Sequence, residues 1–503
     1  MFSTLSSHSD LFTALINSLL LLLGAGLGAL VLGAALAWLA LMQGLAGKGW
    51  LQHLPLLPLA MPPVVLAWAL ELQLAPLAPA EPLLDALPGG AGMALIKAIL
   101  VYSLTLYPLI YLPLLLAARQ QGPAMTEVLG MTDLSLTDYL RRISLPLARY
   151  PLFAGLLLVL LLVLSDYPSQ RLLRLDSLSA QAVQLWVRHG RLGPILPHLG
   201  LLLLLGLALT WLLRHLRGPA PPPQRLHPLR GGLPSRSGAL LALWGLGLFP
   251  VAIAIMLPLW TALSHLDHLG AVRLDPASLS HSLILAGLAL GFGLLGRLLG
   301  LRPGAASGGV LAELLRHGPV LVPGLLLAAL LQALPALPGM GLGALALAAW
   351  LIGLGPGLTL AMTQQPALWY IRSQAYALSR ACALPLWRGL LPFRPYLLRR
   401  WLPGLLLVFL LGLRELQLSY LLLPEDWQTL ALSFYPAALQ QPAQVALPAL
   451  LLLLPGLLGL PLVVLHQRQF YRHPHALGRA AGEAGRQSQA YRDLITHKSQ
   501  PME

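Results

Sequence analysis

Long apolar segments separated by short polar ones dominate this sequence. Eleven such segments recur, at residues 11–43, 54–75, 92–118, 148–167, 192–214, 239–263, 279–301, 317–335, 340–363, 401–423 and 443–466. Most are close to the roughly 20 residues that a helix needs to cross the hydrocarbon core of a bilayer. Alternating strand-like segments of about ten residues are not seen. The pattern predicts an all-α, polytopic membrane protein with about 11 transmembrane helices.

Composition supports the same class. Hydrophobic residues make up 57% of the 503 positions and charged residues only 10%, with a mean hydropathy of +0.74. So little polar surface could not cover a soluble globule of this length. The lipid bilayer is therefore the expected environment of most of the chain.

The net charge of +14 raises the question of nucleic acid, but the distribution of the basic residues answers it. With the N-terminus outside, the cytoplasmic segments of an 11-span chain collect 25 of the 32 Lys and Arg residues. This is the positive-inside bias of membrane proteins. We expect a multi-pass protein of the bacterial inner (plasma) membrane, with the N-terminus outside, the C-terminus cytoplasmic and no nucleic-acid partner.

One loop pattern occurs twice, on the side predicted to be cytoplasmic. The first copy reads Glu127-Val-Leu-Gly-Met-Thr-Asp133, then nine residues, then Ile143-Ser-Leu-Pro146. The second copy reads Ser373-Gln-Ala-Tyr-Ala-Leu-Ser379, then nine residues, then Gly389-Leu-Leu-Pro392. The frame thus returns 246 positions later.

This frame resembles the coupling loop of binding-protein-dependent ABC importer permeases. The loop in that family has the pattern Glu-Ala-Ala, three residues, Gly, nine residues, then Ile-x-Leu-Pro. Here Asp133 and Ser379 replace the Gly, Ser373 replaces the second Glu and Gly389 replaces the Ile. The fused, two-module permeases of iron, thiamine and uncharacterised uptake systems look closest. The resemblance implies two parallel type I permease modules, each coupled to one ATPase.

The same resemblance implies the partners. Two ABC ATPase subunits dock inside, and a periplasmic solute-binding protein docks outside. No cofactor is expected to be bound by this chain itself. The only Gly-Lys pair, Gly47-Lys48, is followed by Gly49-Trp50 and does not form a phosphate-binding loop, so ATP is expected to be used by the partner subunits. The resemblance thus implies that the chain is the permease subunit of an importer and is not itself an enzyme.

Further echoes between the halves set the domain boundaries. Asn17-Ser-Leu at the head of the first span is repeated as His281-Ser-Leu, and Pro108 of the third span is echoed by Pro356. Span 239–263 has no partner in the first half, which gives five spans followed by six. We predict a first module at 1–214 with its coupling loop at 119–147, a Pro- and Arg-rich cytoplasmic linker at 215–238, a second module at 239–466 with its coupling loop at 364–400, and a cytoplasmic tail at 467–503.

Two sets of residues are candidates for function. The ATPase-coupling set follows the repeated loops and comprises Glu127, Asp133, Arg141, Arg142, Pro146, Ser379, Arg380, Trp387, Arg388 and Pro392. The translocation-path set comprises the ionisable residues within apolar spans, which are costly there and are often functional: Glu71, Asp166, Arg414 and Glu415.

Alternatives stay open for several of these residues. Glu71 and Asp166 would equally fit a position near the outer boundary with the charge in water, and Glu415 would fit a structural role. The tail histidines and the single cysteine, Cys382, fit a solvated segment and a reduced loop better than a metal site or a disulfide. A secondary transporter or a polytopic membrane enzyme that works without an ATPase is the alternative function. The identity of the solute is left open by the sequence.

Overall fold

The computed structural model describes residues 2–41, 51–75, 92–120, 145–189, 192–217, 237–265, 276–300 and 427–472, with scattered residues between 401 and 423. Every regular element in this part of the chain is helical, so the predicted all-α class is confirmed there. We refer to residues 2–217 as the first half and to residues 237–472 as the second half.

Most of the long helices follow the predicted apolar segments in order, and several short helices lie between those segments. The first half contains α1 (Phe2–Leu41), the 3-10 helix η1 (Leu51–Ala60), α2 (Pro63–Leu74), α4 (Gly92–Leu106), α5 (Pro108–Gln120), α8 (Leu145–Ser165), α9 (Tyr167–Leu172), α10 (Leu178–His189) and α11 (Leu192–Arg217). The second half contains α12 (Ser237–Ser264), α13 (Pro276–Gly300), α21 (Leu430–Gln440), the 3-10 helix η6 (Pro442–Gln444) and α22 (Ala446–Arg472).

Five helical segments in the described part are long and apolar enough to cross a membrane: Asp10–Ala40, Gly92–Leu115, Gly193–Leu212, Gly247–Ser264 and Pro276–Leu295. Three shorter apolar helical segments occur at Pro63–Leu74, Gly155–Ser165 and Ala446–Gly459. The predicted spans 317–335 and 340–363 lie outside the described residues. These helices are compatible with a multi-pass membrane protein.

Three predicted spans are interrupted where the sequence contains proline or a polar residue. Segment 54–75 divides into η1 and α2 at Met61-Pro62, and segment 92–118 divides into α4 and α5 at Tyr107, just before Pro108. Segment 148–167 ends early, because α8 stops at Ser165 and Asp166 is not helical. Proline cannot donate the helical hydrogen bond, which accounts for the first two breaks.

A stripe of large apolar side chains on α1 is exposed. Phe12, Leu19, Leu23, Leu27 and Val31 are 45–70% exposed, and the last four repeat every four residues on one face. Exposed apolar side chains also occur on α11, α12 and α22, at Trp211, Phe249, Trp260 and Leu458 among others. Such continuous apolar surface fits contact with lipid.

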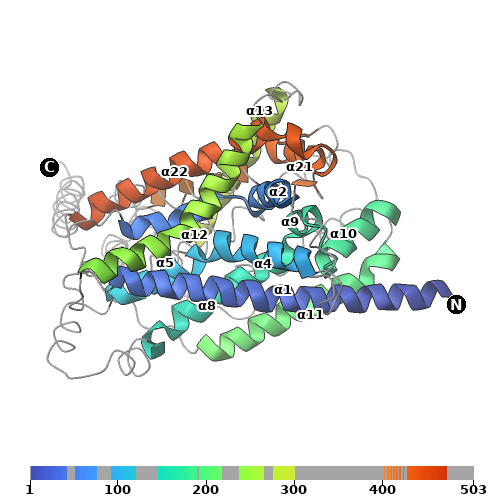
Figure 1. The fold of residues 1–503 in the computed structure, drawn as a ribbon, viewed down its shortest axis with the longest axis horizontal. Coiled ribbons are helices and arrows are strands. Elements are labelled where there is room, and N and C mark those ends of the chain that lie inside the picture. Colours follow the sequence, from blue (N-terminus) through green and yellow to red (C-terminus); the bar gives the residue numbers. More distant parts are fainter. Residues whose placement is uncertain are drawn as a thin grey trace, which may run out of the picture.

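The two halves share one hydrophobic core. Figure 1 shows α1 running the length of the molecule beside α4 and α8, while α12 and α22 of the second half cross over the first half. The helix α12 packs against α2 and η1, and α22 packs against η1 and α12. The helix α9 contacts α2 of its own half and α21 of the second half, near the centre of the molecule.

Candidate functional site

Two serines hold equivalent helices in the two halves. The Oγ atom of Ser18 on α1 accepts a hydrogen bond from the backbone nitrogen of Leu178, the first residue of α10, at 2.9 Å. The Oγ atom of Ser282 on α13 accepts one from the backbone nitrogen of Leu430, the first residue of α21, at 2.8 Å. We call these two contacts the serine tethers. Each satisfies a helix N-terminal N–H group that has no partner within its own helix.

The residues that precede the two serines repeat a second contact. Asn17 Nδ2 donates to the carbonyl oxygen of Asp176 at 3.0 Å, and His281 Nδ1 lies 3.2 Å from the carbonyl oxygen of Gln428. Asp176 and Gln428 each lie two residues before the tethered leucine. The segments Asn17-Ser-Leu and His281-Ser-Leu are therefore similar in their hydrogen bonds as well as in their sequences.

The tethered helices also begin with the same kind of cap. The Ser177 hydroxyl accepts from the backbone nitrogen of Ala180 at 3.2 Å, and the Thr429 hydroxyl accepts from that of Leu432 at 3.3 Å. A hydroxyl at this position satisfies another free N–H group. Each tethered helix is followed by a long apolar helix, α11 or α22. The series α1, α10, α11 thus corresponds to the series α13, α21, α22.

Asp166 lies at the junction between α8 and α9 and is 5% exposed. Its Oδ2 atom accepts from the Ser169 hydroxyl at 2.7 Å, and its Oδ1 atom accepts from the Ser169 backbone nitrogen at 3.4 Å. Its carbonyl oxygen accepts from the Tyr102 hydroxyl at 3.2 Å. The sequence places Asp166 within a span, whereas here it caps the short helix that follows.

Gln170 fixes the same corner of the first half. Its Nε2 atom donates to the Val163 carbonyl oxygen at 2.7 Å, and its Oε1 atom accepts from the Ser179 hydroxyl at 2.8 Å and from the Ser177 hydroxyl. Gln170 is 1% exposed, so this network links α8, α9 and α10 in the interior. Sequence analysis missed it because a single glutamine gives no recognisable pattern.

Glu415 also follows a helical segment. Residues 412 and 413 are helical, whereas Glu415 and Leu416 are not. The backbone nitrogen of Glu415 donates to the Gly412 carbonyl oxygen at 3.4 Å, and its own carbonyl oxygen accepts from the Ser419 hydroxyl at 3.0 Å. Asp166 and Glu415 therefore occupy comparable breaks in the two halves.

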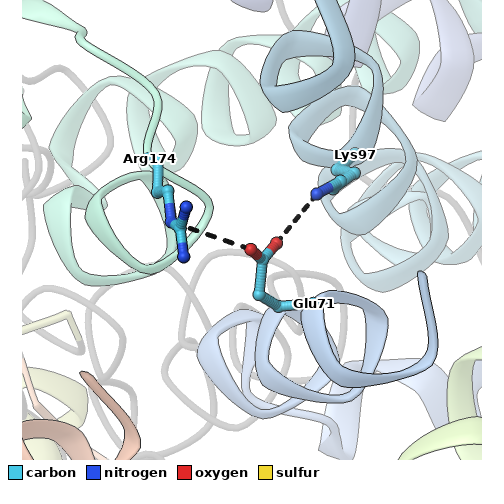
Figure 2. A network of polar contacts seen from close by, with 3 residues as sticks. All are labelled: Glu71, Lys97 and Arg174. Carbon is cyan, nitrogen blue, oxygen red and sulfur yellow. Dashed lines mark hydrogen bonds and ion pairs between the residues drawn. The ribbon is translucent and has the colours of Figure 1, made fainter. Parts of the chain in front are cut away.

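Glu71 belongs to an ion cluster, which Figure 2 shows at close range. Its Oε2 atom lies 2.9 Å from Lys97 Nζ on α4, and its Oε1 atom lies 3.9 Å from Arg174 Nε in the loop after α9. The Lys97 side chain is only 6% exposed, that of Glu71 is 24% exposed and that of Arg174 is 84% exposed. A buried lysine needs such a partner, because leaving its charge uncompensated costs several kcal/mol.

Arg174 adopts an unusual backbone conformation, with φ of 58°. It ends α9 in a motif in which its own nitrogen donates to Arg171 and the Leu175 nitrogen donates to Gln170, at 3.1 and 2.9 Å. Glycine is the residue that usually occupies this left-handed position. An arginine here places a guanidinium beside Glu71, and sequence analysis did not link the two residues.

Contacts between the halves meet around α2. Trp68 Nε1 donates to the carbonyl oxygen of Pro442 at 2.7 Å, and the Trp68 ring lies edge-on to Phe434 at 6.1 Å between centroids. Gln73 Nε2 donates to the Thr261 hydroxyl at 3.2 Å. We call this surface of contact the seam.

Three tyrosines close the seam beside Asp166 and Glu415. Tyr167 comes from the first half, and Tyr420 and Tyr435 come from the second. Their ring centroids lie 5.7–6.3 Å apart, with interplanar angles of 85° and 86° in two of the three pairs. We call them the tyrosine layer. The sequence pattern assigned these three residues no role, because Tyr167 lies far from Tyr420 and Tyr435 in the chain.

Two of the three hydroxyl groups of this layer are buried without a hydrogen-bond partner among the described residues. Tyr167 and Tyr435 are each 2% exposed, and neither phenol oxygen has a hydrogen-bond partner in the described part of the protein. Burial raises the pKa of the Tyr435 phenol, and the positive charge of Arg171 opposes this shift. The phenol is therefore protonated at neutral pH and has a hydrogen-bond donor to offer.

Most of the predicted coupling residues cannot be compared with the structure. Pro146 is the second residue of α8 and is exposed, which fits the preference of proline for the first turn of a helix. Arg414 of the translocation-path set lies outside the described residues. So do the other coupling residues: Glu127, Asp133, Arg141, Arg142, Ser379, Arg380, Trp387, Arg388 and Pro392.

Comparison of the chain with protein-family models, with curated proteins and with solved structures gives no match. In the part of the protein that the structure describes, no group of three or more His, Cys, Asp or Glu side chains is placed to hold a metal ion. The residues brought together are thus the ion cluster, the two helix breaks and the tyrosine layer, all near the seam.

Proposed function

We propose that this chain is the membrane permease of an ATP-driven importer and that it contributes both permease halves. Solute would cross between the halves by alternating access, driven by two separate ATPase subunits on the repeated loops. A solute-binding protein would deliver the solute from outside. The protein would lie in the bacterial inner membrane with its C-terminus in the cytoplasm.

The observation that carries this proposal is the repetition of the serine tethers. The same three contacts occur at the start of α10 and of α21, and the contacting backbone groups are 252 positions apart. The repeated loops lie 246 positions apart, so loop and tether recur with nearly the same spacing. Duplicated modules that each carry a cytoplasmic loop suit a machine driven by a pair of ATPases.

The order of elements also favours two repeated modules, and the predicted topology, with both repeated loops on the cytoplasmic side, makes them parallel. In both halves a long apolar helix is tethered to a short helix, and another long apolar helix comes after that short helix in the chain. Secondary transporters often have inverted repeats, in which the equivalent elements would run in opposite directions across the membrane. The alternative function, a secondary transporter or membrane enzyme without an ATPase, lacks such a specific observation.

Copurification tests the proposal. A tagged chain purified from its native membrane should retain two ATPase subunits per permease chain, counted by quantitative mass spectrometry. Each repeated loop would hold one of them. One ATPase per chain, an obligatory dimer of this chain, or no ATPase at all would contradict the fused-permease proposal.

Variants in the loops test which segments bind the ATPase subunits, and a variant outside the loops provides the control. Replacing Arg141 and Arg142 together by Ala, or Arg380 and Trp387 together, should each remove about one of the two ATPase subunits. Replacing Arg188 by Ala changes an exposed arginine on α10, far along the chain from both loops, and should leave both subunits bound. Equal retention in all three variants would refute the loop assignment.

A further inference from the structure

The tyrosine layer joins the two halves through two aromatic contacts, Tyr167 with Tyr420 and Tyr167 with Tyr435. An aromatic ring has a negative face and a positive edge, so an edge-on contact places positive charge on a negative face. Two of the three contacts in the layer are edge-on, Tyr167 with Tyr435 and Tyr420 with Tyr435. The position that a ring edge now occupies is one that suits a cation.

The charges around the layer favour the same sign. The negative charges of Asp166 and Glu415 both act on the phenol of Tyr167, and Arg171 is the cation that acts on Tyr435. Among the described residues that act on these two phenols, two acidic groups thus oppose one basic group. Aromatic faces combined with acidic side chains attract organic cations, as in the aromatic cages that bind quaternary ammonium groups.

The buried hydroxyls make the closed arrangement costly. A buried polar group without a hydrogen-bond partner destabilises the arrangement that buries it. Tyr167 and Tyr435 each bury such a hydroxyl. Parting of the halves would let both hydroxyls bind water or a polar group of a ligand. The layer is therefore poised to exchange ring-to-ring contacts for contacts with a ligand.

We propose that Tyr167, Tyr420 and Tyr435 form a binding layer for the positively charged group of an organic cation, closed by the two halves in the present conformation. This inference rests on the proposed function, because it takes the seam to be the path of the solute. When the halves part, the ring faces receive the cation, and the phenol oxygens accept from or donate to its polar groups.

Charged thiol reagents test the layer without any ATPase. The full-length chain is reconstituted in lipid with Cys382→Ser and either Tyr167→Cys or Tyr435→Cys. Trimethylammonium-ethyl and sulfonatoethyl methanethiosulfonate are compared, each rate being divided by its rate with a free thiol. The cationic reagent should react about tenfold faster, as one to two cation–π contacts imply. Inert cysteines, or faster reaction of the anionic reagent, would overturn the proposal.

Protection experiments define the ligand chemistry. Choline should slow modification, whereas its neutral isostere 3,3-dimethylbutan-1-ol should not. Equal protection by both would show an apolar cleft and would overturn the assignment to a cation. Tyr107→Cys is the matched control, because Tyr107 is also buried with an unpartnered hydroxyl but lies between α4 and α5. It should be inert to both reagents, and reactivity like that at residue 435 would also overturn the proposal.

A second pair of variants covers the case in which a cysteine at the layer prevents folding. Tyr167→Phe and Tyr435→Phe keep the ring faces, so choline should bind to each within about threefold of the parent chain in a calorimetric titration. No binding of choline to the parent chain or to these variants would overturn the layer. The two proposals can fail separately. If the cationic reagent reacts faster at the seam but the purified chain retains no ATPase, the cation-binding layer stands and the importer proposal is refuted.

Discussion

At the scale of single residues, the ion cluster shows why Glu71 is present in an apolar helix. Lys97 and Glu71 come from α4 and α2, and their charged atoms are 2.9 Å apart. An isolated charge in this interior would be expensive, but a close pair compensates itself. The cluster therefore explains Glu71 by a structural partner, which the sequence alone could not reveal because Lys97 lies 26 positions away.

A double-mutant cycle measures this pairing. Glu71→Gln removes the charge that lies beside buried Lys97 and should destabilise the protein by about 3 kcal/mol. Lys97→Met should also destabilise it, and the double variant should lose less than the sum, with a coupling of about 1–3 kcal/mol. Thermal unfolding followed by circular dichroism provides the measurement. Strict additivity would mean that the two charges do not stabilise each other.

At the scale of elements, close helix packing depends on particular glycines. A Cβ atom on Gly155 of α8 would lie 2.5 Å from the backbone oxygen of Leu109, and one on Gly28 of α1 would lie 2.1 Å from the Ser103 hydroxyl. Small residues let helices approach closely in membranes, where association depends on packing. Gly200 of α11, in contrast, has no heavy atom within 4 Å of such a Cβ.

These two environments give opposite expectations for the same substitution. Gly155→Ala forces a carbonyl group of α5 to move and should destabilise the protein by about 1–3 kcal/mol. Gly200→Ala meets open space and should be neutral or stabilise α11 by up to about 1 kcal/mol. Thermal unfolding of both variants in the same detergent compares them. A stable Gly155→Ala variant would show that α5 and α8 are not packed as described.

The positions of the helices could be predicted from the sequence, but their interruptions could be predicted only in part. Apolar length located α1, α11, α12 and α13 to within a few residues, except at the N-terminus of α1, which begins nine residues before the predicted span. The break at Asp166 depends on a cap from Ser169, and the tyrosine layer depends on residues from both halves. Such contacts arise from tertiary packing, which a local pattern does not encode.

At the scale of the whole molecule, the topology is a prediction that α11 can test. Arg188 lies near the C-terminal end of α10, and His215 lies near the C-terminal end of α11. Both are exposed, and the apolar segment Gly193–Leu212 separates them. With Cys382→Ser, Arg188→Cys should react with an impermeant maleimide in spheroplasts, and His215→Cys should react only after permeabilisation. The reverse pattern would place the N-terminus inside, and labelling of both from one side would show that α11 does not span.

The serine tethers also determine the order in which contacts can form while the chain is being synthesised. Ser18 is 160 residues ahead of its partner, and Ser282 is 148 residues ahead of its own. At about 5–20 residues per second, α1 waits roughly 8–32 s in the membrane before α10 exists. The second wait begins only after the first has ended, because residue 282 follows residue 178 in the chain. The first tether can therefore form while the ribosome is still making the second half, before the two halves meet.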